Sequence, residues 1–155
     1  TLRLREGTGG EFGNIIVTNV PSAGVRQDDC GAETRTHVLP SSGDYLWFSS
    51  QNIIYGASGI AAYELDGSCA GLTTAVMMDP QLTLMPGEAD AASFGFDPRP
   101  MAGGPAYSDF DVVPAGFEVT SYKGAFDTTL WNDQWSWLAE NFKLVTMSVC
   151  GDIST

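Results

Sequence analysis

Short runs of alternating apolar and polar residues, each ended by glycine or proline, constrain the fold of this chain more than any other sequence feature. The first run is Leu2–Arg5, where two leucines alternate with two arginines before a turn of small residues. A run rich in β-branched residues, 12–20, ends at Pro21, and shorter apolar runs follow at 45–48 and 52–55. A period of two between turn residues indicates β-strands.

One helix is expected, near residues 128–142. Aromatic and aliphatic residues recur there at helical spacing and form one apolar stripe, which predicts an amphipathic helix whose stripe is buried in the core. The stripe consists of Trp131, Trp135, Leu138 and Phe142. Trp137 lies off the stripe, and if it is exposed we expect it to contact a sugar or a neighbouring subunit.

These elements predict an all-β (mainly β) protein: a barrel or sandwich of short strands with one C-terminal amphipathic helix. A short parallel β-helix is the alternative. The chain has 155 residues, of which 43% are hydrophobic, and this suits one domain with a real core. We therefore expect a single domain, 1–155, in which 1–10 form a candidate donor strand and turn and 11–155 form the β-rich body.

The charge of the chain argues against two classes of partner. Nineteen acidic and seven basic residues give a formal net charge of −12, which repels nucleic acid and anionic membranes. The sequence also has no run of eighteen apolar residues of the kind that spans a bilayer. We expect neither nucleic acid nor a membrane as a partner.

The cysteines favour an oxidising compartment. Cys30, Cys69 and Cys150 are far apart in the sequence and form no Cys-x-x-Cys pair, so a structural zinc site is not predicted. Two of the three could form a disulfide, and the sequence does not choose among the three pairings. The alternative is three small buried side chains. Because a chain that opens at Thr1 resembles a mature form without its leader, we expect an extracellular, secreted protein.

No catalytic or cofactor motif is apparent. The one histidine, His37, has no Gly-x-Ser-x-Gly turn to serve, and the run GTGGEFG has a phenylalanine where a phosphate-binding loop needs its last glycine. Asp109 with Asp111, or Asp28 with Asp29, could act as general acid and base, yet adjacent surface acids usually form a solvated face. Calcium is the better use of such carboxylates, at Asp28, Asp29 and Glu33 or at Asp90 with Asp97, although no Asp-x-Asp-x-Asp-Gly loop is present. We predict no enzyme activity, no catalytic residue, no metal site and no cofactor.

Several motifs carry a resemblance to a known class of protein. The run FDPRPMAGGPAY is followed by FEVTSYKGAFD and by the tryptophan-rich LWNDQWSWL, an order that resembles the C-terminal segment of secreted bacterial proteins of unassigned function. The opening LRLREGTGGEFGNIIVTNVPSAGV is similar to strand-turn units of β-rich, often β-helical, surface proteins. Together they resemble protomers of bacterial extracellular helical fibrils, and this resemblance implies completion of each protomer by a neighbour's N-terminal strand.

The charge distribution supports assembly independently. Residues 1–43 hold four basic and five acidic groups, a net charge of about −1, whereas 44–155 hold three basic and fourteen acidic groups, or −11. A strand carrying Arg3 and Arg5 would be attracted to an acidic groove, and Leu2 and Leu4 would fill alternate pockets in it. We expect Thr1, Leu2, Arg3, Leu4 and Arg5 to form the interface between identical subunits. The alternative is that this strand pairs within its own sheet.

The sequence therefore predicts a structural subunit of a secreted extracellular fibril, a homopolymer built by donation of the N-terminal strand. The rival function is a secreted β-rich protein that binds or acts on carbohydrate through exposed aromatic side chains. Attachment of a glycan to serine or threonine is left open by the sequence.

Overall fold

A computed structural model describes residues 1–32, 46–56, 59–69, 72, 74–85, 95–141 and 144. The chain folds as two compact units, although the sequence predicted a single domain. The first unit comprises Thr1–Gln81 and Ala102–Ala125, and the second comprises Leu82–Met101 and Phe126–Thr155. Most of the described elements are strands and only one short α-helix is present among them, so the predicted mainly-β class is confirmed.

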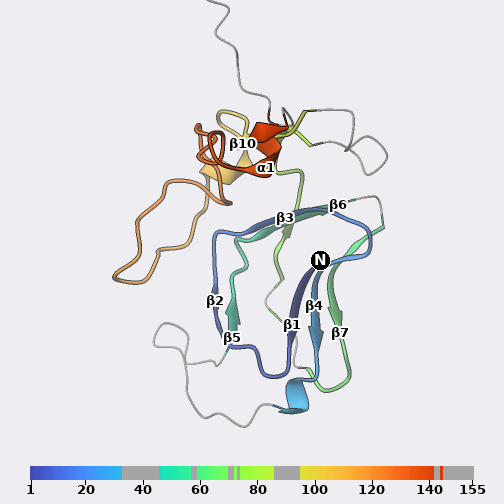
Figure 1. Ribbon diagram of the computed structural model, residues 1–155. Coiled ribbons are helices and arrows are strands. Elements are labelled where there is room, and N and C mark those ends of the chain that lie inside the picture. Colours follow the sequence, from blue (N-terminus) through green and yellow to red (C-terminus); the bar gives the residue numbers. More distant parts are fainter. Residues whose placement is uncertain are drawn as a thin grey trace, which may run out of the picture. The chain divides into compact units, whose positions relative to one another are not determined.

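The first unit contains three small sheets in which every strand pair is parallel. Sheet A has the order β1-β4-β7, sheet B pairs β2 with β5, and sheet C has the order β3-β6-β8. Figure 1 shows β1, β4 and β7 side by side, and β2 beside β5. The strands are β1 (Leu2–Arg5), β2 (Gly10–Phe12), β3 (Ile16–Val20), β4 (Ala23–Asp28), β5 (Leu46–Phe48), β6 (Ile53–Gly56), β7 (Ala61–Leu65) and β8 (Val76–Met77).

The order of the strands along the chain makes this unit a short parallel β-helix. The chain visits sheets A, B and C in turn with β1, β2 and β3, and again with β4, β5 and β6. It then returns to sheet A with β7 and to sheet C with β8. All three sheets contribute side chains to one hydrophobic core, as the sheets of a sandwich do. None of the three closes on itself within the described residues. Of the arrangements expected from the sequence, the parallel β-helix describes how this unit is built.

The core is a stack of apolar residues from successive turns of the coil. Val25, Ile54 and Phe48 are almost fully buried. The ring of Phe48 stacks on Phe12 at a centroid distance of 6.3 Å and meets Tyr63 edge-on at 5.8 Å. Because inward side chains lie above one another in parallel strands, each turn of the coil contributes one layer of the core.

A turn at Asn14 divides residues 12–20, which the sequence predicted as one strand. Asn14 has a φ of 57°, in the left-handed region where asparagine is tolerated, so the chain bends between β2 and β3. The backbone beside Asn14 is held by Asn52, a fully buried residue from the following turn of the β-helix. Its side chain donates to the Phe12 carbonyl at 2.7 Å and accepts from the Ile15 N–H at 2.9 Å.

The irregular segment 102–125 packs against the bend at Asn14, between β2 and β3. It contains the 3₁₀ turn η2 (Pro105–Tyr107), whose Ala106 carbonyl accepts from the Lys123 N–H at 2.8 Å. The Gly124 N–H donates to the Asn14 carbonyl at 2.7 Å, and the Asp111 N–H donates to the Asn14 side chain at 2.7 Å. Long-range hydrogen bonds therefore fix a proline- and glycine-rich segment whose described part has no regular structure besides η2.

The second unit contains an antiparallel pair, β9 (Leu82–Leu84) with β10 (Asp97–Pro100), and the helix α1 (Trp137–Glu140). On β10, Asp97 is buried and forms an ion pair of 2.7 Å with Arg99. Leu144, which follows α1 in the chain, forms an isolated parallel bridge with Phe96.

The predicted helix near 128–142 is wrong in its length and in its packing. The helix begins only at Trp137, because the Ser136 side chain accepts a hydrogen bond from the Ala139 N–H at 3.2 Å and caps it there. Residues 131–135 form turns instead. Trp131 and Trp135 are 54% and 64% exposed, so they are not core residues. Phe142 lies outside the described residues.

Candidate functional site

The predicted donor strand is docked in its own chain. β1 pairs with β4 in parallel, with Leu2 opposite Val25 and Leu4 opposite Gln27. Leu4 is buried in the core, and the Thr1 hydroxyl donates to the Ala23 carbonyl at 2.7 Å. The strand therefore occupies the position expected by the alternative in which it pairs within its own sheet. Donation to a neighbour would require β1 to leave this sheet.

A row of charged side chains crosses the outer face of sheet A. The Asp28 carboxylate accepts from Arg3 Nε at 2.6 Å and from Arg26 Nε at 2.8 Å. Arg26 in turn contacts the Glu64 carboxylate on β7, with Nη1 and Oε1 3.4 Å apart. The row links all three strands of the sheet and starts with a cation on β1 and ends with an anion on β7.

These hydrogen bonds give the fold a testable pH dependence. Arg26 and Arg3 lower the pKa of the Asp28 carboxyl below its ordinary value. A lowered folded-state pKa stabilises the fold above the unfolded-state value, about 3.9, and this contribution is lost as the pH falls through the folded-state pKa. Asp28→Asn should therefore lower the melting temperature near neutral pH, and the gap to wild type should narrow below about pH 4. Thermal melts across the acid range measure this gap, and a gap that stays constant would contradict the assignment.

The two outer strands of sheet A both have a free edge within the described part of the chain. The sheet order β1-β4-β7 places no strand of this part beyond β1 or beyond β7. Register continues from strand to strand: Arg3 is opposite Arg26, and Arg26 is opposite Glu64. Leu65, at the end of β7, is 38% exposed. The two ends of the sheet thus present an arginine and a glutamate in the same row.

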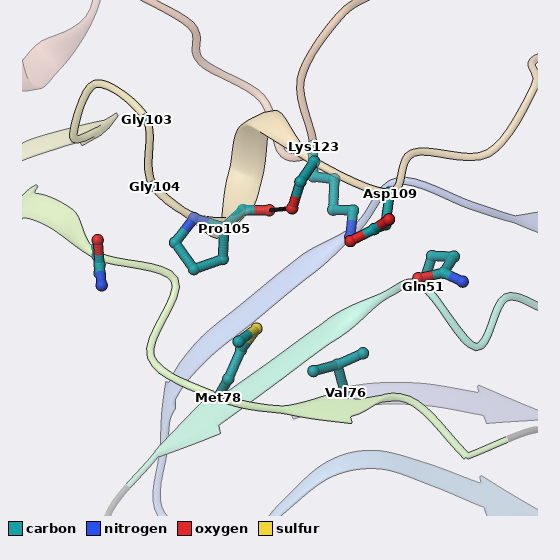
Figure 2. A pocket seen from close by; sticks show the side chains of 10 residues that line it. Gln51, Val76, Met78, Gly103, Gly104, Pro105, Asp109 and Lys123 are labelled. Atoms are coloured by element: carbon teal, nitrogen blue, oxygen red, sulfur yellow. Dashed lines mark hydrogen bonds between the residues drawn. The ribbon is translucent and has the colours of Figure 1, made fainter.

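A separate pocket lies in the first unit, between β8 and the segment 102–125. Its volume is about 410 Å³, and its lining includes Gln51, Val76, Met78, Ser108, Asp109 and Lys123. Figure 2 shows that the Lys123 and Asp109 side chains point toward each other in this pocket. Polar groups line one part of it and the side chains of Val76 and Met78 line another.

Lys123 is the unusual residue of the pocket. It is only 3% exposed, and burial lowers the pKa of its ammonium, while Asp109 and Asp111 oppose that shift. Sequence reasoning missed this residue. One signal in the sequence could have pointed to it. Lys123 is one of only two lysines in an acidic chain, and it lies between two aromatic residues in the run Tyr-Lys-Gly-Ala-Phe.

The second unit carries an exposed aromatic cluster. Phe126 stacks on Trp131 with centroids 5.3 Å apart, and Trp131 meets Trp135 at 5.5 Å. Trp137, the predicted contact residue, is 65% exposed. The tryptophans that the sequence placed in the core therefore form a surface on which a planar or sugar-like ligand could stack.

Of the other predicted site residues, Cys30 and Cys69 form a disulfide with their Cα atoms 5.0 Å apart. Such a bond is compatible with secretion. Cys150 and His37 lie outside the described residues. Within the described ranges, no cluster of three or more histidine, cysteine, aspartate or glutamate side chains is arranged to hold a metal ion. Among those residues, no helix is long and apolar enough to cross a membrane.

Comparison of the chain with protein-family models, with curated proteins and with solved structures finds no match.

Proposed function

We propose that this chain is a structural subunit of a secreted extracellular fibril, in which copies join head to tail through the open edges of sheet A. The observation that carries the proposal is the complementary row at the two ends of that sheet, Arg3 on β1 and Glu64 on β7. The predicted interface residues Thr1 to Arg5 keep their role. They act as an edge on which another copy stacks, and they stay in their own sheet.

An unpaired sheet edge supports the proposal because its N–H and C=O groups are a template for another strand. A parallel β-helix is suited to such growth, since one end repeats the strand direction of the other. If β1 of a second copy followed β7 in register, its Arg3 would lie beside Glu64, and its Leu2 would lie beside Tyr63. Opposite charges and apolar side chains would then continue the rows that already run through the sheet.

The net charge opposes this contact. A formal charge of −12 on each copy produces repulsion at long range, whereas the pairing of Arg3 with Glu64 acts at short range. Repulsion between exposed charges is screened beyond about 10 Å at 0.1 M ionic strength. Growth should therefore be favoured by moderate salt.

A cysteine pair placed in the row tests the proposed contact. Within one chain, positions 3 and 64 are separated by β4, which puts their Cα atoms two strand spacings apart, about 10 Å. In a stacked pair of copies they would be neighbours at about 4.8 Å, within the range of about 4.4–6.8 Å that a disulfide spans. Arg3→Cys/Glu64→Cys, in a Cys150→Ser background, should therefore form covalent ladders on non-reducing gels and filaments by electron microscopy.

A matched variant controls for random oxidation. Arg3→Cys/Tyr55→Cys places the second thiol at an exposed position on β6, the central strand of sheet C, which no second copy can follow in this register. It should give no ladder. If Arg3→Cys/Glu64→Cys forms filaments but no covalent ladder, the subunits do not join through the edges of sheet A. Absence of filaments and of higher oligomers in the wild-type chain would contradict the structural function itself.

The rival function, carbohydrate binding, is favoured by one observation, the exposed cluster around Trp131 and Trp135 in the second unit. The state of the native particle separates the two. A monomer that binds polysaccharide supports the rival, whereas long filaments support the structural subunit.

A further inference from the structure

The pocket beside β8 contains a largely buried lysine, Lys123, whose side chain points toward Asp109. Lys123 is 97% buried, since 3% of its surface is exposed. Lysine is almost never buried to this degree without a partner, because desolvation of its charge is unfavourable. The carboxylates of Asp109 and Asp111 act on it electrostatically. A ligand with acceptor oxygens would give the ammonium a direct hydrogen-bond partner in the pocket.

The rest of the lining narrows the chemistry of that ligand. Asp109 offers acceptor oxygens on the side toward which Lys123 points, and Gln51 and Gln81 each offer a donor and an acceptor. The Ser108 hydroxyl donates to the Pro105 carbonyl at 3.4 Å and offers an acceptor. Val76 and Met78 offer an apolar wall. The volume, about 410 Å³, is in the range of small-molecule sites, roughly 300–1,000 Å³.

Charge decides against ionic ligands. Asp109 at the pocket and the net charge of −12 both repel an anion. The Lys123 ammonium repels a metal cation. A neutral ligand with neighbouring hydroxyl groups meets neither penalty, because one hydroxyl can accept from the lysine while another donates to the aspartate.

We infer that the pocket lined by Lys123, Asp109 and Gln51 binds a neutral hydroxyl-rich ligand, a single pyranose unit of a polysaccharide or glycan. The hydroxyl groups bond to the polar lining and the C–H face of the ring packs against Val76 and Met78. This site belongs to the first unit and uses neither the edge of β1 nor that of β7. It can therefore be present or absent whether or not the chain forms filaments.

The methyl glycosides of glucose, galactose and mannose test the inference as probes, with the whole chain as the protein. Saturation-transfer difference NMR should show transfer from protein to at least one of the three, and competition among them should rank their affinities. Glucuronate and inorganic phosphate serve as anionic probes. Binding of an anionic probe with no transfer to the three glycosides would overturn the neutral-ligand assignment, as would absence of transfer to all of them.

Two variants connect the binding to the pocket. Lys123→Met should weaken the glycoside at least tenfold and leave the melting temperature unchanged or raised, because it replaces a buried charge with an apolar side chain of similar length. If the lysine were only structural, the melting temperature would fall and binding by the folded fraction would persist.

Asp109→Asn removes one negative charge at an exposed position of the pocket and should also weaken binding, whereas Glu118→Gln makes the same charge change outside the lining and should not. Wild-type affinity in both pocket variants would overturn the assignment.

Discussion

Replacing Phe48 with alanine is expected to lower the free energy of unfolding by about 3–5 kcal/mol. Phe48 is 1% exposed, and its ring contacts Phe12 from one turn of the coil and Tyr63 from another. Truncation removes the buried ring and leaves a cavity between Phe12 and Tyr63. The surrounding strands are held by their sheets and cannot move in to fill it. Denaturant unfolding followed by the circular dichroism of the β-sheets measures the loss.

Trp135→Ala is the matched comparison, because it removes an even larger aromatic ring. Trp135 is 64% exposed, its ring is tilted by 31° against that of Trp131, and its indole N–H donates to the Trp131 carbonyl at 3.1 Å. Its truncation should cost less than about 1 kcal/mol. Equal losses in the two variants would contradict the placement of Phe48 in the core and of Trp135 on the surface.

This contrast shows where helical spacing failed as a guide. The tryptophans and Leu138 are spaced as on an apolar helix face, yet Ser136 competes for the backbone and starts a helix in the middle of the stripe. Spacing reports which side chains could share a face. It does not report whether a local cap divides the segment, and here the cap decides.

The strand predictions succeeded further, because period-two alternation is a local property. Leu2–Arg5 is a strand as expected, and the apolar runs at 45–48 and 52–55 hold β5 and β6. Alternation does not identify the partner of a strand or its direction, so the parallel coil could only be an alternative. The break at Asn14 was also missed, because the left-handed turn depends on Asn52 and Asp111, which are distant in the sequence.

The same limit applies to the sites. Arg3 and Arg5 are visible in the sequence, but alternation along one strand does not show that Asp28, one of many acidic residues, pairs with Arg3, whereas Arg5 pairs with its neighbour Glu6. The pocket around Lys123 depends on hydrogen bonds that hold segment 102–125 against the coil, such as that from the Lys123 N–H to the Ala106 carbonyl. Long-range contacts of this kind leave no periodic signal.

Opening the Cys30–Cys69 disulfide is expected to lower the free energy of unfolding by about 4 kcal/mol in the chain-entropy estimate, since the bond closes a loop with a sequence separation of 39. The bond joins the segment after β4 to the segment after β7, two neighbouring strands of sheet A. Reduction frees this loop in the unfolded chain. A loss of this size is a large part of the stability of a small domain, about 5–15 kcal/mol.

Thiol counting on denatured, unreduced protein should first find no more than one free cysteine, because Cys30 and Cys69 are paired. Urea unfolding of oxidised and reduced wild type then measures the loss, and Cys30→Ala/Cys69→Ala should reproduce the reduced state without reductant. Cys150→Ser is the matched control, and it should unfold like wild type in the oxidised state and lose the same stability on reduction. Three free thiols, or a midpoint that reduction leaves unchanged, would show that the bond does not hold β4 and β7 together and would remove the support that the disulfide gives to secretion.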